Sequence, residues 1–444
     1  MADGLVLVDA ILASQPSRGP VNVVIVDDRI EAVGAGEKGP ASLRKLDCSG
    51  LWIGPSFVDL HTHTRLPGAG LDESPEALTR SALLGGFTTA VALANTDPPV
   101  DRVERVFQAR ELFRNLPVEV IQAACVTMER EGEWLVDFRS LWDCGVEVFS
   151  DDGSVVPSAL LMKDALSWSQ RLGVIVAEHA QDPSLGSPGY VNAGVVAHEL
   201  GMVGMPESAE SVVVARDLVL QREVGGRLHL MHLSAPESLL TVEALARGRA
   251  GVTTEVTPHH LLFSDEHLRF EDTNYKVNPP LRSESSRVQL VDAALRGWFD
   301  VVATDHAPHA SSKKNTSFAE AAFGLIGMQS AFSATLTALL ARSDVLGDDS
   351  VERDHQVVGR VFQLLADGPR RLLGRSGGIR VGLRADIAVV DPWKCWTLQS
   401  TEIASLSQNS PYVGHSLTGK VFGLIDGGVV KVWNGSLEID VKRG

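Results

Sequence analysis

The chain has 444 residues, of which 44% are hydrophobic and 22% are charged, so it can bury a large core. Its formal net charge of −16 disfavours nucleic acids and anionic membranes as partners, because both are negatively charged themselves. The four cysteines are scattered, and neither a leader peptide nor an uncharged run of about 18 apolar residues is found, which predicts a cytoplasmic protein with free thiols.

Both ends of the chain are predicted to form β-structure. Short apolar runs broken by Asp-Asp, Gly and Gly-Gly turns occur near each end, a pattern typical of strands. The runs are residues 5–8, 21–26, 30–33, 386–390, 420–425 and 429–433. We therefore expect residues 1–55 and 378–444 to form one composite β-sandwich domain beside the rest of the chain.

The first strand of the middle region ends in two histidines. Gly54-Pro55 precedes the apolar run 56–60, and His61 and His63 follow it. Side chains two apart on a strand point to the same face, so this pair can bind one metal ion. The alternative is that the pair only packs or hydrogen-bonds locally.

Seven further apolar runs follow, separated by helical segments such as 74–84 and 208–222. They are residues 87–95, 118–126, 145–150, 173–178, 227–231, 251–257 and 300–304. Eight short strands alternating with helices predict an α/β fold, a (β/α)8 TIM barrel over residues 56–377, with its chemistry at the strand C-terminal ends. The polar run 310–317 is predicted to be a mobile loop over this mouth, with a plain surface loop as the alternative.

More nitrogen and oxygen ligands stand directly after these strands. They are Asp151 or Asp152, His179, His232 and Asp305. Together with the first two histidines they exceed the four ligands of one tetrahedral ion, which predicts up to two ions bridged by a carboxylate. Ligands without thiolate favour Zn2+, with manganese, cobalt and iron as alternatives. Because the chain is acidic, an anionic substrate needs a local cation, and Arg65 leaves the same strand face.

These motifs, taken in chain order, resemble those of class I dihydroorotases in the amidohydrolase superfamily. The similar strings are HTHTR at 61–65, NTDPP at 95–99, SDDG at 150–153, AEH at 177–179, HLS at 232–234, EVTPHHLL at 255–262, KVNPPLR at 276–282 and TDHAPH at 304–309. The resemblance spans nearly the whole chain. It implies an enzyme that reversibly cyclises N-carbamoyl-L-aspartate to dihydroorotate and water, a step of de novo pyrimidine (UMP) biosynthesis.

The resemblance also implies a role for each site residue. Asp152 would bridge the two ions, and Asp151 would be a structural neighbour that hydrogen-bonds nearby backbone. A metal-bound hydroxide would attack the ring amide, with Asp305 as general acid/base. One ion would be held by His61, His63 and Asp305, and the other by His179 and His232. The substrate carboxylate would be bound by Arg65, Asn95, Asn278 and His309.

Other functions are weighed against this interpretation. No lysine occurs between Lys45 and Lys163, which argues against cyclic amidases that bridge their metals with a carboxylated lysine, such as hydantoinases and allantoinases. A non-catalytic, dihydroorotase-like structural partner of aspartate transcarbamoylase is the second alternative, disfavoured because every expected metal ligand is present. A homodimer and an association with aspartate transcarbamoylase stay open. Three positions depart from the usual pattern: Leu66, Ala322 and Gln329.

Overall fold

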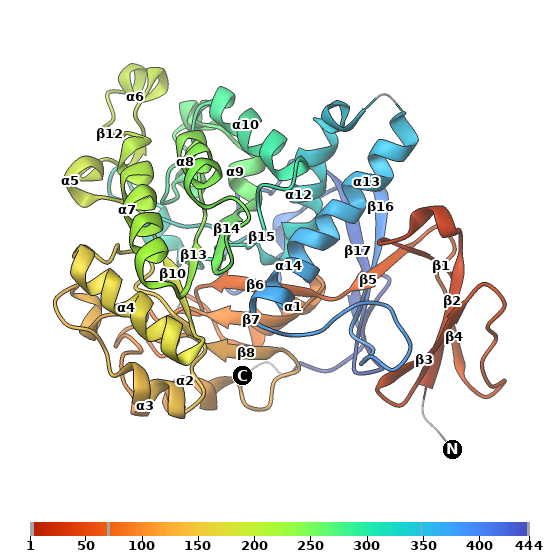
Figure 1. Cartoon of the computed structure of the whole chain (residues 1–444). Coiled ribbons are helices and arrows are strands. Elements are labelled where there is room, and N and C mark those ends of the chain that lie inside the picture. The colour runs from red at the N-terminus through yellow and green to blue at the C-terminus, as the bar shows by residue number, and fades with distance from the viewer. Residues whose placement is uncertain (1–3, 69–71, 348, 442–444) are drawn as a thin grey trace.

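The computed structural model describes residues 4–68, 72–347 and 349–441. Parallel strands covered by helices form the larger part of the molecule, and a sheet built from both chain ends stands beside them (Figure 1). Residues 1–3 and 442–444 of the predicted terminal domain lie outside the described residues. No helix in the described part of the chain combines the length and apolar character that crossing a bilayer requires.

The terminal sheet contains nine strands drawn from both ends, as the sequence predicts. They are β1 (Gly4–Leu12), β2 (Val21–Val26), β3 (Arg29–Gly34), β4 (Arg44–Asp47), β5 (Trp52–Pro55), β16 (Ile387–Thr397), β17 (Ser416–Asp426), β18 (Val429–Trp433) and β19 (Ser436–Leu437). Eight of them follow one hydrogen-bonded path, and β4 pairs with β1 beside it.

The path changes direction at β1. Residues 4–10 of this strand pair with β2 and β4, and Ile11 and Leu12 pair with β5. The register shifts between Leu7 and Ala10, where Asp9 has a φ of 58°, so the strand bends there. The two halves of the path then share one buried apolar cluster that includes residues of β2, β5, β16 and β17.

Eight parallel strands follow in chain order and hydrogen-bond in two groups. The first group is β6 (Phe57–Thr62), β7 (Phe87–Ala92) and β8 (Glu119–Gln122); the second is β9 (Val148–Phe149), β10 (Ile175–Glu178), β13 (Arg227–Leu230), β14 (Val252–Val256) and β15 (Val301–Val302). Parallel bridges between Ala124 and Phe149 and between Thr62 and His306 connect the two groups at both edges. A short pair, β11 (Val191–Asn192) and β12 (Gly204–Met205), lies apart from them.

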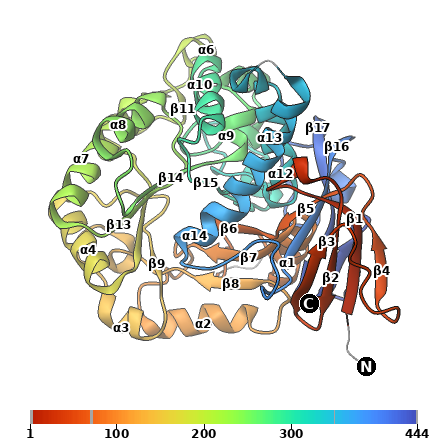
Figure 2. The ribbon, with the colours of Figure 1, turned by 45° about the vertical axis from the view of Figure 1, so that its right-hand side comes forward.

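Helices connect the parallel strands. The α-helices of the described residues are α1 (Pro75–Leu84), α2 (Val103–Phe113), α3 (Phe138–Asp143), α4 (Ala159–Leu172), α5 (Pro183–Gly186), α6 (Val195–Leu200), α7 (Ser208–Val224), α8 (Pro236–Ala246), α9 (Pro258–Leu262), α10 (Glu284–Leu295), α11 (Ser311–Lys314), α12 (Ala331–Leu340), α13 (Ser350–Phe362) and α14 (Gly368–Leu372). Of these, α2, α3, α4, α7 and α8 lie around the outer side of the strands (Figure 2). The predicted helices 74–84 and 208–222 are confirmed as α1 and α7. The first begins where the Ser74 hydroxyl accepts the Ala77 N–H at 3.1 Å.

Two of the strands are much shorter than the apolar runs that predict them. β9 and β15 each pair over two residues, whereas the runs span 145–150 and 300–304. After β9 the backbone turns, and the Ser154 N–H donates to the Asp151 carbonyl at 3.0 Å. After β15 the backbone of Asp305 takes a φ of 48°. The ladder therefore stops where the chain turns to present polar side chains.

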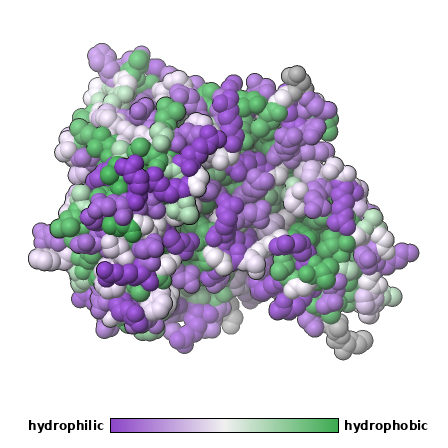
Figure 3. All heavy atoms as spheres, in the orientation of Figure 1, coloured by the Kyte–Doolittle hydropathy of each residue, from purple (hydrophilic) through white to green (hydrophobic). Residues whose placement is uncertain are grey.

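The inner core explains why those side chains converge. Alternate strand residues point to one face, so the face that carries buried apolar side chains also carries the polar residue two positions later. Such series are Val91 and Leu93 before Asn95, Ile175 and Ala177 before His179, and Val301 and Ala303 before Asp305. The outer surface in Figure 3 intersperses hydrophilic with hydrophobic side chains over the helices. The fold thus gathers polar groups at the C-terminal ends of the parallel strands.

Candidate metal centre and substrate pocket

Asp152 lies at the centre of the predicted ligands. Its Oδ2 is 3.3 Å from Nε2 of His61 and 3.3 Å from Nε2 of His63. Its Oδ1 is 3.3 Å from Nδ1 of His179 and 3.3 Å from Nε2 of His232. One carboxylate therefore faces two histidine pairs, one through each oxygen.

Asp305 completes the cluster on the side of the first pair. Its Oδ1 lies 2.9 Å from Nε2 of His63 and 3.3 Å from Nε2 of His61. Burial alone would raise the pKa of Asp305, but the charge of His61 and the hydrogen bond from His63 hold it below its ordinary value. Burial opposes the charged form of Asp152 too, and His61, His179 and His232 lower its pKa well below the usual range. Both carboxyl groups are thus kept ionised.

The donor set fits divalent metal ions. Two triads, His61, His63 and Asp152 and then Asp152, His179 and His232, each place their ligand atoms within 4.8 Å of one another. Nε2 of His61 is buried and has no hydrogen-bond partner among the described residues, so its ring nitrogen is left for another ligand. Nitrogen and carboxylate ligands without thiolate suit zinc and its first-row neighbours.

The backbone is strained where the site residues leave their strands. Arg65, His232 and Asp305 have φ values of 58°, 32° and 48°, in the left-handed region that side chains with a Cβ rarely adopt. His232 breaks the alternation of β13, because Met231, its neighbour, belongs to the inner apolar core. The positive φ therefore turns the imidazole into the cluster, a use of strain that is common at functional sites.

Glu255 of β14 supports this cluster, and the sequence analysis gave it no role. Its Oε1 lies 3.1 Å from Nδ1 of His61 and accepts the backbone N–H of His232 at 3.1 Å. Its Oε2 lies 3.1 Å from Nε2 of His229. Burial opposes its charge, but hydrogen bonds from His229 and His61 lower the pKa of Glu255 to about 2. A carboxylate behind a metal-binding imidazole fixes its orientation.

Asp59 and Asp151 are further carboxylates with structural contacts. Asp59 accepts the N–H and the hydroxyl of Thr304 at 2.8 and 2.6 Å, which ties β6 to the segment that presents Asp305. Asp151 accepts the N–H groups of Val126 and Thr127 at 2.8 and 3.1 Å, which confirms its predicted backbone contacts. The signal that the sequence offered for Asp59 and Glu255 was a carboxylate inside an otherwise buried strand, where an unpaired charge is rarely tolerated.

The predicted substrate residues surround the outer side of the cluster. Arg65 donates through Nε to the Pro308 carbonyl at 3.2 Å, and its Nη2 lies 3.1 Å from Nε2 of His309. Burial and the charge of Arg65 lower the pKa of His309 to about 3, so this imidazole is neutral near pH 7. The structure therefore brings the arginine and the neutral histidine together as one unit.

The two predicted asparagines contact the ligands themselves. Asn95 places Oδ1 2.9 Å from Nδ1 of His63 and donates through Nδ2 to the Asp152 carbonyl at 3.2 Å. Asn278 places Nδ2 3.2 Å from Nε2 of His179. Both amides thus orient the histidine and carboxylate cluster, a contact that the sequence analysis did not anticipate.

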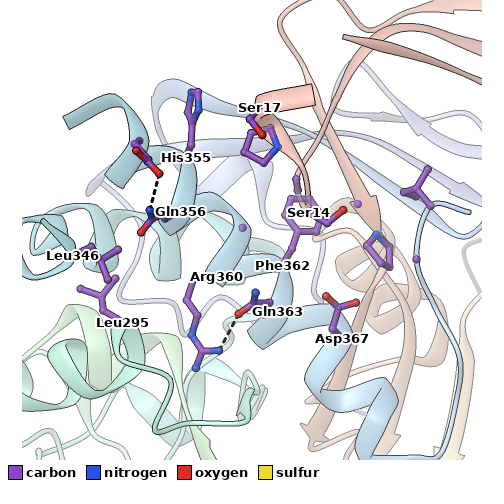
Figure 4. A pocket seen from close by; sticks show the side chains of 18 of the residues that line it. Ser14, Ser17, Leu295, Leu346, His355, Gln356, Arg360, Phe362, Gln363 and Asp367 are labelled. Carbon is purple, nitrogen blue, oxygen red and sulfur yellow. Dashed lines mark hydrogen bonds between the residues drawn. The ribbon is translucent and has the colours of Figure 1, made fainter. Parts of the chain in front are cut away.

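These side chains line a pocket of about 150 Å³. Its walls include Arg65, Asn95, Asp152, Phe323 and Gly324. A cavity of about 790 Å³ lies between α13 and β5 (Figure 4), and no predicted ligand lines it. There Arg360 turns toward Gln363, 3.2 Å away, and donates to the Ala294 carbonyl at 2.8 Å. Cavity size therefore does not locate the chemistry of this chain.

The departures from the usual pattern lie outside the cluster. Leu66 is buried, and Gln329 donates to the Glu402 carbonyl at 2.8 Å and accepts the Ala404 N–H at 3.0 Å. The run 310–317, predicted to be a loop, contains helix α11, and its Lys314 is only 3% exposed.

Comparisons with known proteins identify the family. Residues 50–238 match the family described as Dihydro-orotase-like. The dihydroorotase of Caldicellulosiruptor saccharolyticus is 35% identical over 94% of this chain and 95% of its own length. The chain belongs to the dihydroorotase family. The dihydroorotase of Lactiplantibacillus plantarum, a further member, is 36% identical over 91% of this chain and 93% of its own.

A solved structure shows that the fold extends beyond the dihydroorotase family. The L-hydantoinase (dihydropyrimidinase) from Arthrobacter aurescens superposes with a TM-score of 0.85 over 99% of this chain and 98% of its own, at 20% identity. This chain and that hydantoinase therefore share the arrangement of parallel strands and terminal sheet, so the fold alone does not determine the chemistry.

Proposed function

We propose that this chain is a class I dihydroorotase, which reversibly cyclises N-carbamoyl-L-aspartate to dihydroorotate and water. The observation that carries the proposal is the convergence of Asp152, Asp305 and four histidines beside the Arg65–His309 pair. Such a site combines metal ligands with a cation for a carboxylate. A cyclic amide that bears a carboxylate is the substrate that needs both.

The metal-binding residues divide into two sets with one shared member. His61, His63 and Asp305 would hold one ion, His179 and His232 the other, and Asp152 would bridge them. Zn2+, one or two per chain, is the metal that this donor set favours. When bound, such ions lower the pKa of water and polarise a carbonyl oxygen.

Asp305 is the proton carrier in this proposal. On ring closure the ureido nitrogen forms a bond to the side-chain carboxyl carbon and loses a proton, while a C–O bond breaks; the leaving oxygen takes up that proton and a second one from solvent, and departs as water. The ionised carboxylate of Asp305 accepts that proton and delivers it to the leaving oxygen, a contribution of about 10²- to 10⁴-fold. In the hydrolytic direction the same oxygen returns the proton to the ring nitrogen.

Arg65 and His309 select the substrate. A guanidinium pairs bidentately with a carboxylate, and Arg65 has one amino group facing His309 and the pocket. Nδ1 of His309 is buried and has no hydrogen-bond partner among the described residues; because the proton of this neutral ring is on Nε2, which donates to the Phe323 carbonyl, Nδ1 can accept an N–H of the substrate. Asn95 and Asn278 would complete the clamp from positions that also touch His63 and His179.

The proposal extends to the architecture and its partners. We propose that the eight parallel strands close into a (β/α)8 barrel over residues 56–377, supported by the two bridges that connect their edge strands. Residues 1–55 and 378–444 would form the second domain. A cytoplasmic location, a homodimer and an association with aspartate transcarbamoylase remain predictions.

The experiment is a cyclisation assay on purified protein whose metal content is measured. Formation of dihydroorotate from N-carbamoyl-L-aspartate is expected, with activity lost on chelation and restored by Zn2+. Dihydrouracil and unsubstituted hydantoin, which lack the carboxylate, serve as matched substrates and should not be opened. A metal-loaded protein that opens these rings as readily as dihydroorotate is a different cyclic amidase.

A further inference from the structure

One wall of the pocket is formed by residues 318–324, which we call the lysine-held wall. Phe323 and Gly324 line the same pocket as the predicted metal ligands Asp152 and His179. The wall contains no metal ligand and no residue that the sequence analysis singled out, apart from the departure at Ala322. Its contacts nevertheless involve two of the most deeply buried cations of the described residues.

Lys314, at the end of α11, holds the C-terminal part of this wall. Its ammonium donates to the carbonyls of Ala322 and Gly324 at 2.8 and 2.9 Å, and the side chain is 3% exposed. The Gly324 carbonyl also accepts from Nδ2 of Asn409 at 3.2 Å. Two separate donors therefore fix the residue that lines the pocket.

Lys276 holds the N-terminal part of the wall in a different way. Its ammonium donates to the Ala319 carbonyl at 2.8 Å and lies 4.6 Å from the ring centroid of Phe323. The rings of Tyr190 and Phe318 lie 5.2 and 5.8 Å from the same nitrogen. Three aromatic faces thus take the place that a carboxylate holds in most buried ion pairs.

The ammonium groups of Lys314 and Lys276 interact with backbone carbonyls, and that of Lys276 also with aromatic rings, rather than with carboxylates. Among the ion pairs of the described residues, the neighbouring Lys313 pairs with Asp72, but neither Lys276 nor Lys314 has such a partner. Burial lowers the pKa of Lys276 to about 8 and, with the charge of Lys276, that of Lys314 to about 7. Holding two desolvated cations here is costly, so a role in the pocket accounts for their place better than stability does.

The wall touches the substrate side of the pocket through His309. The Phe323 carbonyl accepts from Nε2 of His309 at 2.7 Å, and the same nitrogen lies 3.1 Å from Nη2 of Arg65. Gly324 has a φ of 123°, and a Cβ there would lie 2.6 Å from Cβ of Ala307 and 3.2 Å from Nε2 of His309. The imidazole is therefore held between the wall and the arginine with no room to spare.

We propose that Lys276 and Lys314 are positioning residues for substrate specificity: they fix the lysine-held wall, which holds His309 against Arg65 for the substrate carboxylate. The kinetic part of this inference rests on the proposed function. The structural part does not, because it concerns only the order of residues 318–324. Removing either ammonium frees the carbonyls of the wall, so His309 and the arginine lose their common geometry while the metal ligands keep theirs.

The test replaces each lysine by methionine, which is similar in length and has no charge. Lys314→Met and Lys276→Met are expected to raise KM for dihydroorotate about 10-fold, because each loses the hydrogen bonds of its buried amino group, with kcat and zinc content within about 2-fold of wild type. The matched control is Lys394→Met, at an exposed lysine of β16. A fall in kcat with unchanged KM, or a loss of zinc, would contradict the positioning role.

Hydrogen exchange tests the wall without any reaction. The amides of Ala322 and Gly324 donate to the carbonyls of Lys313 and Lys276 at 3.0 and 2.9 Å, so they report directly on this segment. They should exchange about 10-fold faster in the lysine variants, while amides of β10 keep their protection. Unchanged exchange in Lys314→Met overturns the proposal even if the chain has no dihydroorotase activity.

A further variant tests the same proposal without replacing a lysine, in case a lysine variant does not fold. Gly324→Ala keeps both ammonium groups but pushes a methyl group against Ala307 and His309. It should raise KM by about the same 10-fold as the lysine variants, since it disturbs the same imidazole from the other side. Wild-type KM in Gly324→Ala would show that the wall does not position His309.

Discussion

Two walls of one pocket solve the problem of burying charge in opposite ways. On the metal-binding side, carboxylate oxygens and imidazole nitrogens face one another, with Asp152 3.3 Å from four ring nitrogens. On the lysine-held side, Lys276 and Lys314 face backbone carbonyls and aromatic rings. The first wall keeps lone pairs free to take up metal ions, whereas the second uses its lysine donors to hold a segment still. We infer that chemistry belongs to one wall and substrate geometry to the other.

The largest effect is expected on the metal-binding wall. Asp305→Asn keeps the shape of the side chain but removes the basic carboxylate oxygen, so turnover should fall by about 10²-fold or more while the fold persists. Steady-state assays and circular dichroism measure the two quantities, and Asp143→Asn, at an aspartate that is 52% exposed, is the control. Near-normal turnover in Asp305→Asn would place the proton carrier elsewhere.

The residue between the two walls should affect specificity. Arg65→Met removes the bidentate partner of the substrate carboxylate, so kcat/KM for dihydroorotate should fall by at least about 10²-fold. Arg139→Met, the same substitution at an arginine that is 60% exposed, is the control and should leave kcat/KM unchanged. An unchanged rate constant for Arg65→Met would mean that neither wall selects the carboxylate through this arginine.

A smaller effect is expected behind the metal ligands. Glu255→Gln keeps the size of the side chain but removes the charge that faces His61 and His229, which should weaken zinc binding by about 10- to 100-fold. Competition with a chelator of known affinity measures this change. Lys314→Met, on the other wall, should leave zinc affinity as it is. Equal affinities in Glu255→Gln and wild type would remove Glu255 from the metal centre.

The two walls also differ in how far the sequence predicts them. The metal-binding wall follows from strand alternation: a polar residue two positions after buried apolar ones, as in Ala177 and His179, must share their face. Strand alternation alone does not distinguish Asp151 from Asp152 as the bridging ligand, and the resemblance to class I dihydroorotases favours Asp152. His232 shows the limit of this reasoning, since only a positive φ brings its ring into the cluster.

The lysine-held wall gives no such pattern. Lys314 lies in a polar run that predicts a surface loop, yet its ammonium is buried against carbonyls ten and eight residues further on. Contacts of a charged side chain with backbone leave no complementary residue type in the sequence. The bend at Asp9, which joins the two halves of the terminal sheet, is not predicted either, because it depends on backbone geometry and not on the apolar pattern.

The smallest predicted effect is a pH dependence of stability that arises from the lysine-held wall. Burial lowers the pKa of Lys314 to about 7, whereas an unfolded lysine titrates near 10.4. Between these values the unfolded chain carries a proton that the folded chain has released. Unfolding therefore takes up a proton, and the free energy of unfolding rises with pH by up to about 1.4 kcal/mol per unit.

Urea unfolding between about pH 7.5 and 9.5 measures that slope. Lys314→Met should make it shallower, because the buried amine is gone, whereas Lys394→Met should leave it unchanged. Two charges act on Lys314 and stay in both proteins: Lys276, which lowers its pKa, and Asp272, which opposes that shift. Lys276, whose pKa is about 8, titrates in the same pH range, so the free energy of unfolding of Lys314→Met should still rise with pH, but less steeply. If Lys314→Met and wild type share one slope, the ammonium of Lys314 is not desolvated, and the contrast between the two walls is lost.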